Sequence, residues 1–122
     1  MSEGTTRRAA IGEKVWVLLN RVKADKRELH ERFIHDILRP TALQVDPATV
    51  RKVRYLHPTE PNEDGTYTYI FLMDPVADGA DYNIENLLKQ VHGEEKGLEY
   101  HQMWADSLAE EQTGYEVTQS PW

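Results

Sequence analysis

The segment from Val15 to Lys23 is the feature that most restricts the fold, because it is apolar on both of its alternating faces. The first face carries Val15, Val17 and Leu19, and the second carries Trp16, Leu18 and Val22. Successive side chains of a strand point to opposite sides of a sheet, so this pattern predicts a strand that is covered on both sides. The fold must therefore shield two faces from water.

A helix is predicted after this strand. Asp25 and Glu28 have the spacing of a capping box, which predicts a helix start at Asp25. An apolar stripe follows at helical spacing, made of Leu29, Phe33, Ile34, Ile37 and Leu38. Pro40 disfavours helical geometry at Arg39, so we expect it to end or kink the helix. The segment 40–49 is then expected to be a connection with a turn at Asp46-Pro47.

Two segments rich in β-branched and aromatic residues, 50–57 and 66–73, flank the turn-forming segment 58–65 and predict a hairpin. The second segment is apolar on both faces and is expected to be central in the sheet. If paired residue numbers have an even sum, Tyr55 and His57 lie on the same face as Tyr67, Tyr69, Phe71 and Met73. With an odd sum they lie beside Ile70 and Leu72 instead.

The last part of the chain predicts two helical pieces and a short strand. Ile84, Leu87, Leu88 and Val91 have helical spacing, with Asn83 as a cap and Gly93 as a stop. A second piece is expected from about Glu94 to the region of Ala109, weakened in its first turn by Gly97. The polar, alternating segment 114–119 predicts the last strand.

The length of 122 residues fits one domain, which we place at 14–119 after a flexible tail at 1–13. Hydrophobic residues make up 39% and charged residues 29%, an ordinary globular composition. The chain has no cysteine, which excludes disulfides and thiolate metal sites and fits a cytoplasmic location. No apolar run approaches the roughly 20 residues that cross a bilayer, so no membrane partner is expected.

The formal net charge of −7 argues against a nucleic-acid partner, because phosphate binding depends on clustered Lys and Arg. The charge is uneven along the chain: residues 1–57 sum to +5 and residues 58–122 to −12. Such asymmetry indicates either a charged partner or segments of opposite charge that pack on each other. We favour the internal pairing.

The order strand, helix, hairpin, helix, strand is the ferredoxin-like βαββαβ order, an α+β fold with a four-stranded antiparallel sheet and helices on one face. One helix layer covers only one face, so a second copy must cover the other. This pattern resembles the dimeric α+β-barrel superfamily of antibiotic-biosynthesis-monooxygenase-like and stress-responsive barrel-like proteins. The resemblance implies a homodimer in which two sheets meet face to face and enclose a cavity.

The resemblance also implies two catalytic residues. Haem-degrading and related monooxygenases of this superfamily have an Asn-Arg pair late in the first strand, where Asn20-Arg21 stands here, and a His in the second helical region, where His101 lies. The Trp of those haem enzymes corresponds to Leu88, which argues against haem degradation. From the residues alone, Asn20 on an apolar face needs a partner, either backbone or substrate. His101 is either a general base or an ordinary helix histidine.

Aromatic residues supply the predicted ligand-binding set: Trp16, Tyr55, His57, Tyr69 and Trp104. The same aromatic residues are also suited to a core or a subunit interface. No metal site and no cofactor is predicted. His30 and His35 are one residue too far apart for a zincin helix, where their rings would stand about 140° apart. The segment Gly93–Gly97 lacks the Lys and hydroxyl of a phosphate loop.

These observations lead to two hypotheses of different classes. The first is a dimer that binds a small apolar or aromatic molecule, as a cofactor-independent monooxygenase or a cyclase. The second is a non-catalytic dimerisation or regulatory module, whose sheet face makes only subunit contacts. The contents of the cavity distinguish the two hypotheses.

Overall fold

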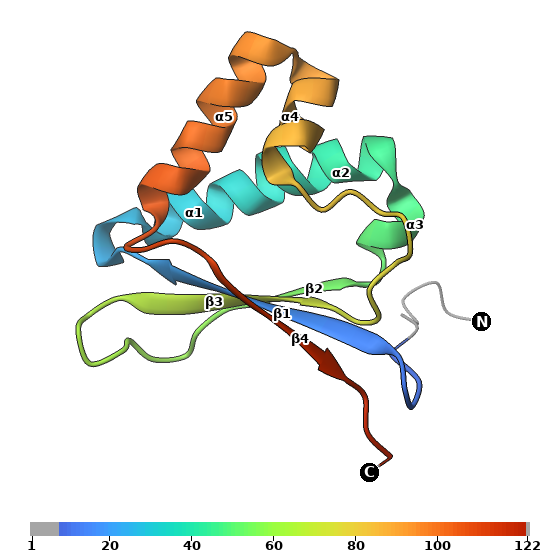
Figure 1. Ribbon diagram of the computed structural model, residues 1–122. Helices are drawn as coiled ribbons and strands as arrows, with labels where there is room; N and C mark the ends of the chain where they lie inside the picture. Colours follow the sequence, from blue (N-terminus) through green and yellow to red (C-terminus); the bar gives the residue numbers. More distant parts are fainter. Residues whose placement is uncertain (1–7, 122) are drawn as a thin grey trace.

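The computed structural model describes residues 8–121, which form one four-stranded antiparallel sheet with a helical layer on one side (Figure 1). The strands are β1 (Lys14–Val22), β2 (Val53–Leu56), β3 (Tyr67–Met73) and β4 (Thr113–Thr118). Their order across the sheet is β2-β3-β1-β4. This is the ferredoxin-like α+β arrangement predicted from the sequence.

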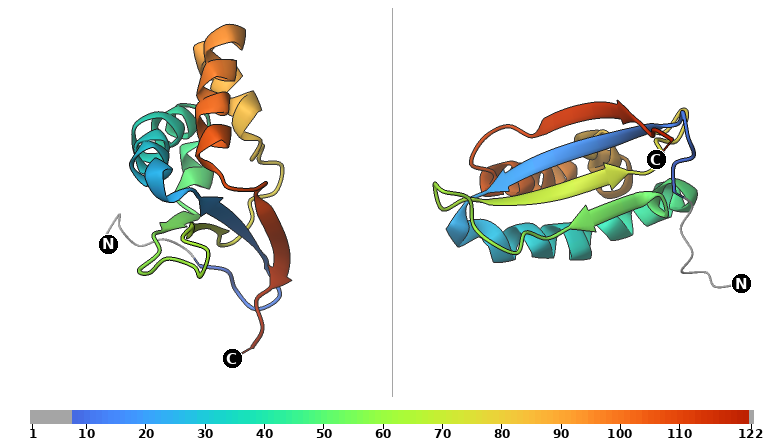
Figure 2. Two further views of the ribbon diagram at one scale, coloured as in Figure 1. Left: turned by 90° about the vertical axis from the view of Figure 1, so that its left-hand side faces the viewer. Right: turned by 90° about the horizontal axis from the view of Figure 1, so that it is seen from below.

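The helical layer consists of segments between β1 and β2 and between β3 and β4. The first set is η1 (Ala24–Lys26), α1 (Arg27–Phe33), η2 (Ile34–Leu38), α2 (Arg39–Val45) and α3 (Pro47–Val50), and the second is α4 (Ile84–His92) and α5 (Glu94–Ser107). In Figure 1 all of them lie above the sheet, and the view from below in Figure 2 shows the strands with no helix in front of them. Within residues 8–121, no helix therefore covers the second face of the sheet, which is called the open face below.

The residue numbers of paired residues in β2 and β3 have an even sum, which is the first of the two registers considered above. Tyr55 of β2 lies opposite Phe71 of β3, and Val53 lies opposite Met73. On the other side of β3, Asn20 of β1 lies opposite Tyr69. Cross-strand partners share a face, so the aromatic face of the hairpin and the Trp16 face of β1 both point toward the helices. Their most buried members join the core of Phe33, Ile34, Phe71, Met73 and Leu88.

The predicted capping box at the start of the first helix is wrong. The chain enters through the short 3-10 segment η1, and no side chain caps η1 or α1. The Lys23 N–H donates to the Ser107 carbonyl at 3.0 Å, so the chain direction there is set by α5. Glu28 instead accepts from Arg32 at 2.7 Å on the exposed surface of α1. The predicted local cap is therefore absent, and a tertiary hydrogen bond holds the chain just before η1 to the end of α5.

The predicted connection at 40–49 is also wrong, because the chain stays helical through Pro40. Arg39 keeps helical angles of φ −61° and ψ −48°. The segment before it, η2, is a π-helix, and Pro40 falls in the first turn of α2. Proline is tolerated where its missing N–H has no regular partner, and π-type turns shift the hydrogen-bonding pattern in that way. Asp46 then caps α3, accepting from the Thr49 N–H at 3.2 Å.

The second helical pair agrees with the sequence. Asn83 caps α4 by accepting from the Asn86 N–H at 2.9 Å, and Gly93 ends it with φ +93°. Gly97 has a packing role, because a Cβ there would stand 2.7 Å from the Lys89 backbone. The glycine that weakens the first turn of α5 therefore lets α4 and α5 approach closely.

The two oppositely charged parts of the sequence pair with each other in several places. Arg21 contacts both Asp64 and Glu110, the latter at 2.8 Å. Lys14 lies 3.8 Å from Glu116, and Arg54 lies 3.8 Å from Asp74. Some of the excess positive charge of residues 1–57 is thus paired with carboxylates of residues 58–122 within the domain.

The predicted flexible tail at 1–13 lies mostly outside the described residues, which begin at Arg8. Within the described part, the Ala9 N–H donates to Asp74 Oδ1 at 2.7 Å, and the Gly12 N–H donates to the Gln119 carbonyl at 2.9 Å. Among residues 8–121 no helix is long and apolar enough to span a bilayer.

Candidate functional site

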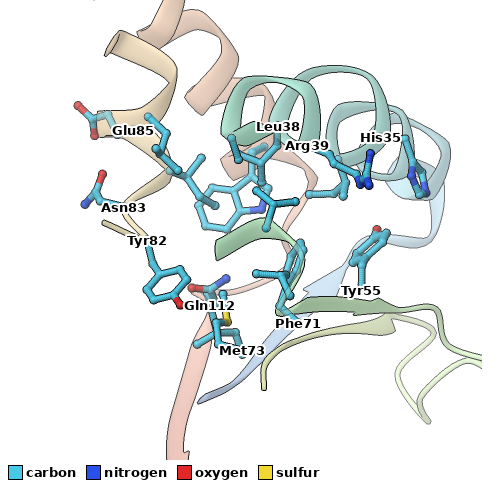
Figure 3. A pocket seen from close by; sticks show the side chains of 18 of the residues that line it. His35, Leu38, Arg39, Tyr55, Phe71, Met73, Tyr82, Asn83, Glu85 and Gln112 are labelled. Atoms are coloured by element: carbon cyan, nitrogen blue, oxygen red, sulfur yellow. The ribbon is translucent and has the colours of Figure 1, made fainter. Parts of the chain in front are cut away.

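A cavity of about 760 Å³ lies between the helical layer and the covered face of the sheet. This volume is within the usual range for small-molecule sites. Mainly apolar and aromatic residues line it, with polar groups grouped toward its two ends (Figure 3). All residues that line this cavity come from one chain, whereas the family resemblance implied a cavity between the sheets of two chains.

The floor of the cavity is the part of the sheet where the even register brings large side chains together. Tyr55 stacks on Phe71 with ring centroids 4.8 Å apart, and Met73 continues the row along β3. Leu18 of β1 completes the floor. These residues alternate with others that face the open side, so the period of two in the sequence creates the floor.

The roof comes from three helical segments. Ile34, Leu38 and Ala42 line it from the continuous helical run η2 to α2, at the three-to-four-residue spacing of one helix face. Ile84 and Leu87 line it from α4, and Trp104 from α5. Because the chain stays helical through Pro40, α2 extends far enough to cover the cavity.

One end of the cavity holds a cluster of rings: His35, Tyr55 and His57. Tyr55 lies 5.6 Å from His35 and 4.9 Å from His57, measured between ring centroids. Outside the cavity, Glu31 Oε1 is 3.9 Å from His57 Nδ1. Burial raises the pKa of the Tyr55 hydroxyl well above its usual value, so Tyr55 is a neutral phenol at physiological pH.

The other end holds a carboxylate and a histidine. His101 Nδ1 is 4.0 Å from Glu85 Oε1, and both residues line the cavity. A 2.6 Å hydrogen bond from Lys89 lowers the pKa of Glu85, so this carboxylate stays ionised. Tyr82 is nearby along the chain, and its Oη accepts from the Ala77 N–H at 2.9 Å. An ionised carboxylate beside a histidine is an arrangement suited to proton transfer.

Two predicted ligand-binding residues do not line the cavity. Tyr69 is fully buried beneath Tyr55, where its hydroxyl donates to Glu31 and accepts from Arg27 at 3.0 Å. Trp16 lies beside Tyr82, with ring centroids 5.2 Å apart, and its Nε1 donates to Glu116 at 3.0 Å. Of the predicted ligand-binding set, the cavity brings together Tyr55, His57 and Trp104, along with the predicted catalytic His101.

Asn20 is fully buried and reaches the cavity only through another residue. Its Oδ1 accepts from Gln112 Nε2 at 3.4 Å, and Gln112 lines the cavity. Its Nδ2 has no hydrogen-bond partner within residues 8–121. Asn20 therefore positions Gln112 instead of facing the cavity itself.

His30 is the most strongly perturbed histidine near the site. It is fully buried, and desolvation lowers its pKa to about 4. Its Nδ1 is 3.0 Å from Ser107 Oγ, whose own hydroxyl donates to the Trp104 carbonyl at 2.6 Å. Since that proton is already used, His30 Nδ1–H is the donor to Ser107, which leaves Nε2 as an unprotonated acceptor. Nε2 has no partner among the described residues.

Several cavity residues were not predicted from the sequence: His35, Arg39, Arg51, Tyr82, Glu85 and Gln112. The spacing of His35, Arg39 and Ala42 is a helical signal, but it was hidden by the expectation that Pro40 ends the helix. Within residues 8–121 no three His, Asp or Glu side chains come together as a metal site.

The described residues form a ferredoxin-like α+β fold with a ligand-sized cavity, partly open to solvent, between its helices and its sheet. The chain matches no protein-family model, and a search of curated proteins found no significant match. Among solved structures, it is similar to a candidate antibiotic-biosynthesis monooxygenase from Caulobacter crescentus. That match has 13% identity and a TM-score of 0.49 and covers 91% of this chain and 92% of the other. The likeness concerns the arrangement of elements only.

Proposed function

We propose that the protein binds a small, largely apolar or aromatic molecule in the cavity between its helices and its sheet. The observation that carries this proposal is a 760 Å³ space whose floor is the Tyr55–Phe71 stack and whose roof includes Trp104. Aromatic rings favour stacked or edge-to-face contact with a planar ligand. The space is partly open to solvent, so a small molecule can enter it, and its volume and apolar lining are those of a small-molecule cleft.

For turnover, we propose a cofactor-independent monooxygenase or a cyclase, the two reaction types that the family resemblance implies. Both begin with removal of a proton from the substrate. His101 is the proposed base, because it lines the cavity and has the ionised Glu85 beside it. His101→Ala is expected to abolish turnover and leave the fold intact.

The binding proposal is tested with a planar probe and a substitution that fills the cavity. Titration with 2-naphthol, followed by calorimetry, should give saturable binding of one molecule per chain. Ala42→Phe adds a ring to the roof and should remove binding, whereas Ala48→Phe, on the exposed surface of α3, should not. Equal binding by both variants, or none by the wild type, would contradict the proposal and favour the non-catalytic module.

We also propose that the open face of the sheet pairs with a second copy. Its apolar members are Val15, Val17, Leu19, Leu56, Ile70, Leu72, Tyr115 and Val117. Three of these are notably exposed in one copy: Leu56 at 42%, Tyr115 at 55% and Val117 at 46%. A contiguous apolar patch of this kind marks an interface, and an identical face on a second copy is complementary in character.

Sedimentation velocity at micromolar concentration tests the pairing. Leu72→Lys places a charge at the centre of the open face and should convert a dimer into monomers. Leu98→Lys is the matched control, because Leu98 is 52% exposed on α5, away from the sheet. A wild-type protein that sediments as a monomer would contradict the pairing.

A further inference from the structure

Arg39 and Arg51 line the cavity and have no ion-pair partner within residues 8–121. Other arginines of this chain are paired: Arg21, Arg27, Arg32 and Arg54 each lie within 4.0 Å of a carboxylate. The contrast is notable because the protein has 21 acidic and 14 basic residues. In an acidic protein, unpaired arginines at a ligand-sized cavity are available to an anionic ligand.

The charges along the cavity are unequally distributed. Arg39 is four residues after His35 on the same helical run, so the two side chains lie on one face of it. In Figure 3 both lie above Tyr55, at the end opposite Glu85 and Asn83. Glu85 is the one carboxylate among the residues lining this cavity, and Lys89 binds it at 2.6 Å. Among the residues that line the cavity, the positive charge therefore lies at the Arg39 end and the negative charge at the Glu85 end.

We propose that the ligand is an aromatic carboxylate, with its carboxylate bound by Arg39 and its ring on the Tyr55–Phe71 stack. A guanidinium matches a carboxylate with two parallel hydrogen bonds, which are stronger than those between neutral groups. The distal edge of the ring then points toward His101 and Glu85. This inference rests on the proposed binding function and adds the chemical class and orientation of the ligand.

Glu31 is the carboxylate beside His57, and it lies outside the lining of the cavity. Its carboxylate is already engaged, since it accepts from the Tyr69 hydroxyl and lies 3.9 Å from Arg27. Its remaining neighbour is His57, at 3.9 Å from Nδ1. Glu31 therefore does not neutralise Arg39.

Two probes of nearly equal shape test the inference: 2-naphthoate, which is anionic, and 2-naphthamide, which is neutral. Wild-type protein is expected to bind the naphthoate about tenfold more tightly or better, with a preference that shrinks as salt is added. Arg39→Gln should reduce the preference to within about threefold, and Arg39→Lys should keep part of it. Arg32→Gln, a paired surface arginine on α1, is the control and should keep the full preference.

The outcomes separate this inference from the proposed function. If wild-type protein binds both probes equally, or Arg39→Gln keeps the wild-type preference, the carboxylate assignment is wrong and the binding function stands. If neither probe binds and Ala42→Phe has no effect on the binding of 2-naphthol, the cavity itself is not a binding site. Because Arg39 is exposed, its replacement is not expected to affect folding, and a thermal melt of each variant checks this.

Discussion

The two faces of the sheet are both apolar but have different surroundings. On the covered face, Phe71 and Met73 are 7% and 6% exposed and border the cavity. On the open face, Tyr115 and Val117 are about half exposed. The same alternating sequence therefore forms two different surfaces: one set of side chains builds the floor of the cavity, and the other forms an apolar face that no helix of residues 8–121 covers. Substitutions on the two faces should therefore have different effects, and the largest is expected in the core.

Phe71 and Leu72 are adjacent in β3 and point to opposite faces, which makes them a matched pair. Phe71→Ala should lower the free energy of unfolding by about 3–5 kcal/mol, because it removes a buried ring from the core. Leu72→Ala should cost about 1 kcal/mol in a single copy and act mainly on dimer dissociation. Urea denaturation and sedimentation measure the two effects. Equal losses of stability would mean that the two faces are equally buried.

Lowering the pH should destabilise the folded protein through His30, which is buried on the covered side of the sheet. Its pKa in the folded state, about 4, lies below the unfolded value of 6.5, so the unfolded chain binds the proton first as the pH falls. The free energy of unfolding is therefore not reduced by His30 above pH 6.5. It falls as the pH is lowered toward 4, by about 2–3 kcal/mol near pH 4.5. Urea titrations at several pH values should show this loss in the wild type.

His30→Gln should lack that part of the pH dependence, although its stability at neutral pH is lower. His57→Gln is the control, because His57 is exposed. A His30→Gln variant with the wild-type slope between pH 6.5 and 4.5 would show that His30 is not held neutral by burial.

Asn83→Ala should destabilise the protein by about 1 kcal/mol, because it removes the cap of α4, which forms part of the cavity roof. Thermal unfolding measures the loss. Asn83→Asp keeps a capping oxygen and should stay close to wild type. A stable Asn83→Ala variant would mean that packing alone determines where α4 begins.

Asp25→Ala should change the stability by less than about 0.5 kcal/mol, since Asp25 caps no helix and is exposed. A chemical denaturation curve with the same midpoint as wild type is the expected result. A loss of stability near 1 kcal/mol would mean that Asp25 caps the first helix, contrary to the structure.

The sequence predicted features that depend on local pattern and failed where tertiary contacts or unusual helical turns decide. Alternating patterns predicted β1 and β4, the β-branched and aromatic composition predicted β2 and β3, and Asn83 and Gly93 marked α4 correctly because their effects are local. Pro40 was misleading, since the π-helical turn before it accommodates the proline. Asp25 was misleading because no side chain caps η1 or α1, and the chain before η1 is held instead by a hydrogen bond from Lys23 to Ser107, which is distant in sequence.

The candidate site was predicted only in part, for the same reason. Tyr55, His57 and Trp104 follow from the aromatic pattern and His101 from the family resemblance, and all four line the cavity. Asn20 was identified as a buried amide, but its partner Gln112 is 92 residues away and no local pattern connects them. Arg39 could be found only once the helix was known to continue through Pro40.

The measurement that tests the central claim most directly is the indole N–H signal of Trp104 in a two-dimensional NMR titration with 2-naphthol. Trp104 lines the cavity and its Nε1 has no partner within residues 8–121, so a bound ring should shift its signal. Trp104→Phe identifies the signal among the three tryptophans. The account predicts a saturable shift at one ligand per chain that Ala42→Phe abolishes. A Trp104 signal that stays unchanged while 2-naphthol binds elsewhere would contradict it.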